Sequence, residues 1–258
     1  MKEHYQPNYW ACWETCKDPE LRRQKARKIR SILEAAAPQL IEQGGRALDV
    51  GCSIGVISEH LVLAWPHWEI VGVDIDAEAL RLARSRGARL PLCVGDALQL
   101  PFPDAAFELV LCAQVYEHVP DWRRLLREIQ RVLRPGGVCF FSGPNRLFPV
   151  ELHYDLPLLP YLPRPLAHRV VRWSGKAPLY YERPVSWWTL RHALEDLGFV
   201  IEDYTYRLLE DPQQFHLNGR WVRIFSRWVR RLPPRFRPWL TPWMPNFNLV
   251  LRKPEGRG

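Results

Sequence analysis

A glycine-containing turn after a short apolar run is the feature that most constrains this chain. Residues 47–58 read ALDVGCSIGVIS. Residues 47–50 predict a buried strand and residues 56–64 predict the helix that follows it. Glycine permits positive φ and lets a ligand approach the backbone, while a helix start offers unpaired N–H groups. The sequence therefore predicts a strand–turn–helix unit built to hold a ligand.

Two common ligand patterns do not fit this turn. The dinucleotide pattern G-x-G-x-x-G fails because Val56 stands at its last glycine, and the phosphate pattern G-x-x-x-x-G-K-[ST] fails because no lysine follows Gly55. What remains is an acid followed by small residues at alternate positions: Asp49, Gly51, Ser53 and Gly55. An acid at the strand end would repel a pyrophosphate. The turn therefore favours a ligand that carries an ammonium group.

Further segments continue the pattern of alternating strands and helices. EIVGVDID predicts a strand ending at Asp74, and an acid about twenty residues beyond a glycine turn can hold two ribose hydroxyls. LCVGDALQLPF, FELVLCAQVYEHVPDW and VLRPGGVCFFSGPN predict three more strands, the last after a helix and a Pro-Gly-Gly turn. Such alternation predicts a parallel sheet, which binds ligands at the carboxyl ends of its strands. The polar residues expected at those ends are Asp49, Asp74, Asp96, Gln114 and Asn145.

In this order, the segments resemble the motifs of the class I S-adenosylmethionine (SAM) methyltransferases, whose first motif usually has glycine where this chain has Ser53. The resemblance implies SAM as cofactor, with Asp96 at the adenine amino group. EHVPD and LRPGG are typical of a subgroup that methylates small molecules, quinones and lipids. The implied cofactor-binding residues are Asp49, Gly51, Ser53, Gly55, Asp74, Ile75, Asp96, Ala97 and Gln114.

The predicted fold class is α/β, a doubly wound Rossmann-like sheet of seven strands with helices on both faces. The sheet is expected to be mostly parallel, with an antiparallel last strand. Further helices are expected at residues 77–86, 121–133 and 186–197, and the last two strands at 199–206 and 247–252.

Three parts of the chain are expected around this sheet. Residues 1–45 should form an N-terminal helical extension, whose helix begins at Asp18-Pro19-Glu20 and carries a solvated basic face at residues 21–30. The aromatic residues Tyr5, Tyr9, Trp10 and Trp13 should pack on the protein, with the cofactor cleft as the candidate position. Residues 46–258 should form the methyltransferase domain, with insertions at about 146–185 and 208–246. The first, here called the lid segment, is rich in proline, leucine and aromatics and should cover the substrate.

Composition indicates the cellular environment and the kinds of partner expected for the protein. Its 258 residues are 47% hydrophobic, but no apolar run is long enough to span a bilayer, and the N-terminus lacks the apolar core of a signal peptide. Scattered cysteines, with Cys12 and Cys16 lacking a second ligand pair, indicate a reduced protein without zinc. We therefore expect a cytoplasmic protein. The net charge of +8 suits an anionic membrane surface, a nucleic acid or an acidic substrate.

Candidate catalytic residues follow the fourth and fifth strands. Glu117, His118 and His153 could remove a proton from the methyl acceptor. Alternatively, EHVPD mainly shapes the turn into the next helix, and Glu117 and His118 are partly structural. The same three residues resemble the metal site of small-RNA 3′-end methyltransferases. Gln114, a weaker ligand, replaces the first glutamate of that site, so the sequence favours a lone catalytic histidine and predicts no metal.

The second insertion contains an arginine- and tryptophan-rich helix with three interpretations. It could pack its apolar stripe on the core, lie on anionic lipid, or bind nucleic acid, which is the least expected because no RNA-binding module is present. One predicted face carries Arg220, Arg223, Arg227 and Arg231; the other carries Trp221, Ile224, Phe225, Trp228 and Leu232.

The sequence thus predicts a SAM-dependent methyltransferase acting on a small or lipid-linked acceptor, with oxygen as the expected target atom. The inner face of the membrane is a second expected location, reached through residues 220–232. Two alternatives stay open: an RNA methyltransferase acting on 3′ ends or tRNA, and a non-catalytic SAM-binding protein.

Overall fold

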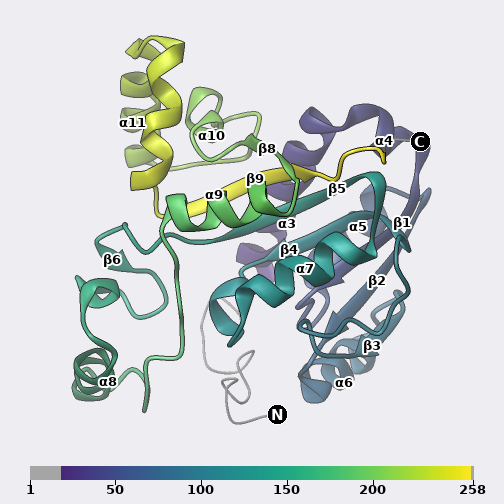
Figure 1. Cartoon of the computed structure of the whole chain (residues 1–258), viewed down its shortest axis with the longest axis horizontal. Helices are drawn as coiled ribbons and strands as arrows, with labels where there is room; N and C mark the ends of the chain where they lie inside the picture. Colours follow the sequence, from purple (N-terminus) through teal and green to yellow (C-terminus); the bar gives the residue numbers. More distant parts are fainter. Residues whose placement is uncertain (1–18, 257–258) are drawn as a thin grey trace.

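The computed structural model describes residues 19–256 and shows one seven-stranded sheet in the order β3-β2-β1-β4-β5-β9-β8 (Figure 1). Neighbours from β3 to β5 pair in parallel, whereas β9 pairs antiparallel with both β5 and β8. This arrangement confirms the predicted fold class. The strands are β1 (Gly45–Val50), β2 (Trp68–Asp74), β3 (Leu92–Val94), β4 (Phe107–Ala113), β5 (Leu133–Pro144), β8 (Val200–Asp203) and β9 (Asn246–Arg252).

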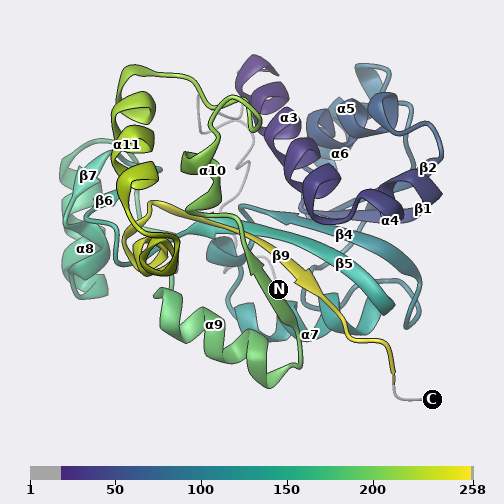
Figure 2. The same ribbon diagram turned by 90° about the horizontal axis from the view of Figure 1, so that it is seen from above.

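Helices cover both faces of the sheet, because alternate strand residues point to opposite sides. In β4, Leu109 and Leu111 pack with α3 and α5, whereas Val110 and Cys112 pack with α7 and α9. Figure 2 shows these two helical layers above and below the sheet. The helices are α3 (Pro19–Ala36), α4 (Pro38–Gln43), α5 (Val56–Ala64), α6 (Ala77–Ser85), α7 (Trp122–Val132) and α9 (Trp187–Asp196).

The predicted helix boundaries agree with the structure to within about one residue. Asp121 and Ser186 cap α7 and α9 by accepting backbone N–H bonds, as their residue types predict. The chain also forms the short helix α4 after Pro38, a segment for which the sequence made no separate prediction. Two local predictions were wrong: β5 already begins at Leu133, before the expected Pro-Gly-Gly turn, and β8 ends at Asp203. The last difference arises because the chain then bends into α10 (Arg207–Glu210).

The lid segment has a small core of its own and returns to the sheet where it left. It contains β6 (Val150–Glu151), β7 (Leu156–Pro157), η3 (Leu159–Tyr161) and α8 (Arg164–Trp173), which lie beyond the end of β5 in Figure 1. At its two ends, Asn145 bridges to Val185, and the Arg146 N–H donates to the Val185 carbonyl at 3.1 Å. The buried residues of its hydrophobic core are Tyr154, Leu159, Ala167, Val171 and Tyr180.

The second insertion forms α11 (Arg220–Arg231) and η4 (Pro234–Trp243), which stand at one end of the molecule (Figures 1 and 2). Of the three interpretations of this helix, the one that packs its aromatic stripe on the core is contradicted. Among the side chains of α11 that the structure describes, Val229 and Ser226 are buried. Phe225 is 50% exposed and Trp228 is 51% exposed, so these rings face outward.

Several predictions fall on residues that the structure does not describe, namely those on Tyr5, Tyr9, Trp10, Trp13, Cys12, Cys16 and the cap at Asp18. Within residues 19–256, no helix has the length and apolar content needed to cross a bilayer.

Candidate functional site

The glycine turn after β1 has the tight backbone that its sequence predicts. Gly51 has φ +70°, and a Cβ there would lie 2.6 Å from Val115 Cγ2. Gly55 has φ +77° and precedes the first residue of α5. Ser53 also adopts positive φ, at 53°, although serine does so less readily than glycine. The serine therefore keeps the turn that the family's usual glycine would form.

The turn is joined to the end of the next strand by the carboxylate of Asp74. The Ser53 N–H donates to Asp74 Oδ2 at 2.7 Å, and the Asp76 N–H donates to Oδ1 at 2.8 Å. Burial raises the pKa of Asp74, and these two hydrogen bonds oppose that shift. Each oxygen keeps a second lone pair, so Asp74 can still accept from ribose hydroxyls.

The other expected cofactor residues also lie at the carboxyl ends of the strands. Asp96 follows β3 and accepts the Leu98 N–H at 2.8 Å. Ile75 and Ala97 are half-buried beside Asp74 and Asp96. Gln114 follows β4 with φ 60°, and its side-chain amide donates to Asn246 at 3.3 Å.

Asp49 is the most perturbed carboxyl of this group. It is 3% exposed, and Ser58 donates a hydrogen bond to it. Burial raises the pKa of Asp49 to about 7, an effect that the Ser58 hydrogen bond and Arg22 oppose and Asp74 increases. A ligand ammonium beside this carboxylate would relieve the cost of its burial.

Arg22 of α3 was missed by the sequence analysis. It belongs to the basic run expected to be solvated, and Arg23 and Arg27 do form exposed ion pairs with Glu20. Arg22 is instead 8% exposed, and its guanidinium lies 3.5 Å from Ser53 Oγ. The signal lay in the helical spacing, which places Arg22 on the same face as the buried Ala26 and Ile29.

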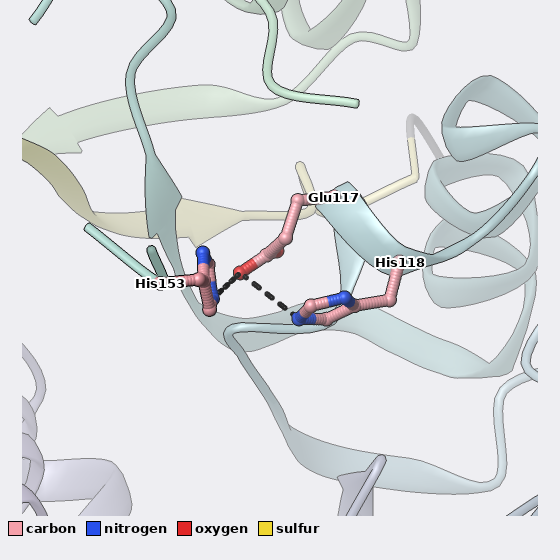
Figure 3. Close-up of side chains that lie close together, drawn as sticks. All are labelled: Glu117, His118 and His153. Carbon is pink, nitrogen blue, oxygen red and sulfur yellow. Dashed lines mark ion pairs between the residues drawn. The ribbon is translucent and has the colours of Figure 1, made fainter. Parts of the chain in front are cut away.

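A second group of polar side chains follows β4 at the same edge of the sheet. Glu117 and His118 lie in the 3₁₀ turn η2 (Tyr116–His118), and His153 comes from the lid segment. Figure 3 shows both imidazoles turned toward one oxygen of Glu117. His118 Nε2 lies 3.7 Å and His153 Nε2 4.0 Å from Glu117 Oε1. The structure thus brings together all three predicted catalytic residues.

Burial strongly affects the protonation of this group. It raises the pKa of Glu117 to about 7, although the charge of His153 opposes the shift. Burial and the charge of His153 hold the pKa of His118 well below its usual range. For His153, burial lowers the pKa, but the Glu151 hydrogen bond and the nearby carboxylates outweigh it and give a pKa of about 9.

Two further carboxylates of the lid segment complete the group, and the sequence analysis missed both. Glu151 is 2% exposed, and its Oε1 lies 2.9 Å from His153 Nδ1. Its Oε2 accepts the N–H groups of His153 and Tyr154, both at 2.8 Å. Glu182 is fully buried and lies 4.0 Å from His118 Nδ1. The adjacent Arg183 N–H donates to the Glu117 carbonyl at 2.8 Å and so fixes this approach.

Comparisons with known proteins agree with this arrangement. Residues 48–141 match the family described as "Methyltransferase domain". The chain is 31% identical over 195 residues to a trans-aconitate 2-methyltransferase of Azoarcus sp. (strain BH72), covering 69% of this chain and 73% of that protein. It is 34% identical over 128 residues to a ubiquinone biosynthesis O-methyltransferase of Aromatoleum aromaticum (strain DSM 19018 / LMG 30748 / EbN1), covering 45% of this chain and 54% of that protein.

Solved structures add evidence about the fold alone. The plantazolicin methyltransferase BpumL superimposes with a TM-score of 0.60 at 15% identity, over 94% of this chain and 86% of that one. At such low identity, the match supports the architecture and leaves the acceptor undefined.

Proposed function

Given that the chain belongs to the class I SAM-dependent methyltransferases, we propose that it methylates an oxygen atom of a small or lipid-linked acceptor. SAM supplies a methyl group on a positively charged sulfur, which leaves as a neutral thioether. The observation that carries the proposal is the cluster of the buried Glu117 with the half-buried His118 and His153, at the same sheet edge as the acids Asp49 and Asp74.

We assign the cofactor to the carboxyl ends of β1, β2 and β3. Asp74 would accept from the two ribose hydroxyls, and Asp96 would meet the adenine amino group. Asp49 would face the ammonium of the amino-acid part. The bare backbone at Gly51 supports this placement, since any side chain there would collide with Val115.

The chemical step requires that the two reactants are held in line and that a nearby group accepts the proton of the acceptor hydroxyl. Holding both reactants in line supplies most of the rate of a displacement at an activated methyl group. A hydroxyl acceptor must also lose its proton, because neutral oxygen is a weak nucleophile at neutral pH. The proton would pass to the cluster as the oxygen forms its bond to the methyl carbon, and the electrons of the broken carbon–sulfur bond would stay on sulfur.

The surface of the lid segment supports an apolar acceptor. Besides its own buried core, the segment exposes several large apolar side chains: Leu152, Leu158, Tyr161, Leu166, Trp173 and Leu179. A polar metabolite would not need such a surface, whereas a prenyl or acyl chain would remove it from water.

The helices α11 and η4 support delivery of that acceptor from a membrane. We define the α11–η4 surface by its exposed aromatic rings, Phe225, Trp228, Phe236, Trp239 and Trp243. Residues 219–237 contain seven arginines and no acid, so this surface suits anionic headgroups.

Labelled SAM tests the proposal. The purified protein would be incubated with SAM carrying a trideuterated methyl group and with membrane lipid extract, small metabolites or RNA in separate reactions. We expect label in a lipid-soluble or small product, released as labelled iodomethane by hydriodic acid, which cleaves methyl ethers and esters. Label on carbon would refute O-methylation, and label on RNA alone would refute the acceptor class. Asp96→Asn protein is the control for background transfer.

A further inference from the structure

Both histidines of the catalytic cluster have the same relation to their carboxylate neighbours. Each turns Nε2 toward Glu117 Oε1, at 3.7 Å for His118 and 4.0 Å for His153 (Figure 3). Each also turns Nδ1 toward a second carboxylate, Glu182 at 4.0 Å and Glu151 at 2.9 Å. Both imidazoles therefore present Nε2 to the same oxygen of Glu117, and each presents Nδ1 to a second carboxylate.

Glu117 lacks the hydrogen bonds that a buried carboxylate usually accepts. Its side chain is fully buried, and neither oxygen accepts a hydrogen bond from any residue in the described part of the chain. Burying such a group without compensation is costly, so buried charges are usually paired or bound to a metal. The ligand atoms of Glu117, His118 and His153 all lie within 4.8 Å of one another.

From this geometry we infer that Glu117, His118 and His153 bind one divalent transition-metal cation, with Glu151 and Glu182 as outer carboxylates that orient the two imidazoles. Ligands about 2.1 Å from a tetrahedral ion lie about 3.4 Å apart. The observed distances of 3.7 and 4.0 Å from the nitrogens to Glu117 exceed this value by only a few tenths of an ångström. Two imidazoles and one carboxylate favour zinc, iron, manganese or cobalt over magnesium or calcium.

The outer carboxylates explain why the imidazoles present Nε2. A metal-binding histidine commonly donates its other ring N–H to a carboxylate, which fixes its tautomer and orientation. Glu151 is placed for this role because its second oxygen is held by the N–H groups of His153 and Tyr154. Since Glu151, His153 and Glu182 come from the lid segment, the cation would also join that segment to the turn after β4.

The role of the cation in catalysis rests on the proposed function, whereas its binding does not. With its three side chains bound to the cation, the cluster would no longer accept the proton, and the acceptor hydroxyl, made more acidic beside the cation, would lose its proton to water instead. The oxygen would then take the methyl carbon, and the carbon–sulfur electrons would remain on sulfur. Binding can be measured without SAM or acceptor, so a negative result would leave a lone imidazole as the base and the proposed methyl transfer intact.

The experiment measures metal binding to the full chain directly. Chelator-treated protein would be equilibrated with Zn²⁺ or Co²⁺, desalted and assayed by mass spectrometry of the elements. We expect one equivalent of either cation, weak binding of Mg²⁺, and Co²⁺ absorption bands of nitrogen and oxygen ligands. Absence of a bound equivalent, or a thiolate-to-Co²⁺ charge-transfer band, would overturn the inference, the latter by assigning the metal to cysteines.

Matched variants test which residues bind the cation. Glu117→Gln and His153→Asn should abolish the bound equivalent, whereas Glu151→Gln and Glu182→Gln should weaken binding 10- to 100-fold, as expected for outer partners. His192→Asn removes an exposed histidine of α9 and should bind like the wild type. Circular dichroism without metal would check that each variant folds. If folded Glu117→Gln and His153→Asn proteins bound the metal as tightly as His192→Asn, the site would be elsewhere.

Discussion

Replacing Asp49 with asparagine should change how the stability of the protein depends on pH. The carboxyl is 3% exposed, and burial raises its pKa from 3.8 to about 7. The native state therefore binds a proton that the unfolded chain has already lost between these two pH values. That proton stabilises the native state at low pH, and its contribution is lost as the pH rises through 7. Asparagine is neutral throughout and has no such loss.

The size of the effect follows from the two pKa values. One pKa unit corresponds to about 1.36 kcal/mol. Between pH 5 and pH 9, the unfolded carboxyl loses its last protons while the native carboxyl titrates across its whole range. Integrated over this pH interval, the difference in proton binding between the native and unfolded states corresponds to about two pKa units. The free energy of unfolding of the wild type should therefore fall by about 2–3 kcal/mol relative to that of Asp49→Asn.

Urea denaturation of both proteins at pH 5 and pH 9 measures the effect without SAM. The comparison cancels all other titrating groups, since both chains share them. We expect Asp49→Asn to gain stability relative to the wild type as the pH rises. A relative change below about 0.5 kcal/mol, or one of opposite sign, would show that the Asp49 carboxyl is not held as described. Glu69→Gln, on an exposed residue of β2, is the control and should show no comparable change.

Three further outcomes are expected. Asp74→Ala should weaken SAM binding by roughly 1.5–3 kcal/mol for each ribose hydrogen bond lost, whereas Asp196→Ala on α9 should not; equal affinities by calorimetry would refute the ribose assignment. Trp228→Ser should reduce sedimentation with phosphatidylglycerol vesicles at low salt, with Leu63→Ser on α5 as the exposed control; no wild-type binding would refute the membrane role of the α11–η4 surface. Tyr116→Phe removes a buried hydroxyl that bonds backbone at both ends of the lid segment and should cost about 1–3 kcal/mol in urea denaturation; an unchanged midpoint would show that this hydroxyl does not hold the segment.

Local sequence signals were sufficient for the sheet and for the cofactor end of the site. Apolar alternation and capping residues such as Asp121 act over a few positions, so α5, α6 and α7 could be placed to within about one residue. The acids at the strand ends could be found for the same reason. The burial of Arg22 was harder to predict, because only its position on the same helical face as Ala26 distinguishes it from its solvated neighbours.

The outward orientation of α11 could not be read from its amphipathic pattern. That pattern contains two candidate apolar stripes, one with the large aromatic rings and one with Val222, Ser226 and Val229. The larger stripe would gain more by burial if it met a suitable surface. The helix instead packs on α10 and buries Val229, since the neighbouring segment decides which stripe is covered. Periodicity defines the faces of a helix, whereas tertiary contacts select the one that is buried.

The acceptor end of the site combines residues from distant parts of the chain. Glu117 and Glu182 are 65 positions apart, and they lie on the same side of the site because the Arg183 N–H donates to the Glu117 carbonyl where the lid segment, which has its own core, returns to the sheet. No local motif encodes such a contact. SAM is common to the whole family, so its contacts can reside in short motifs of the sheet, whereas the acceptor differs between members, and we propose that the lid segment meets it. The position of Glu151, His153 and Glu182 within one insertion therefore predicts that exchanging the lid segment would alter acceptor choice while leaving SAM binding intact.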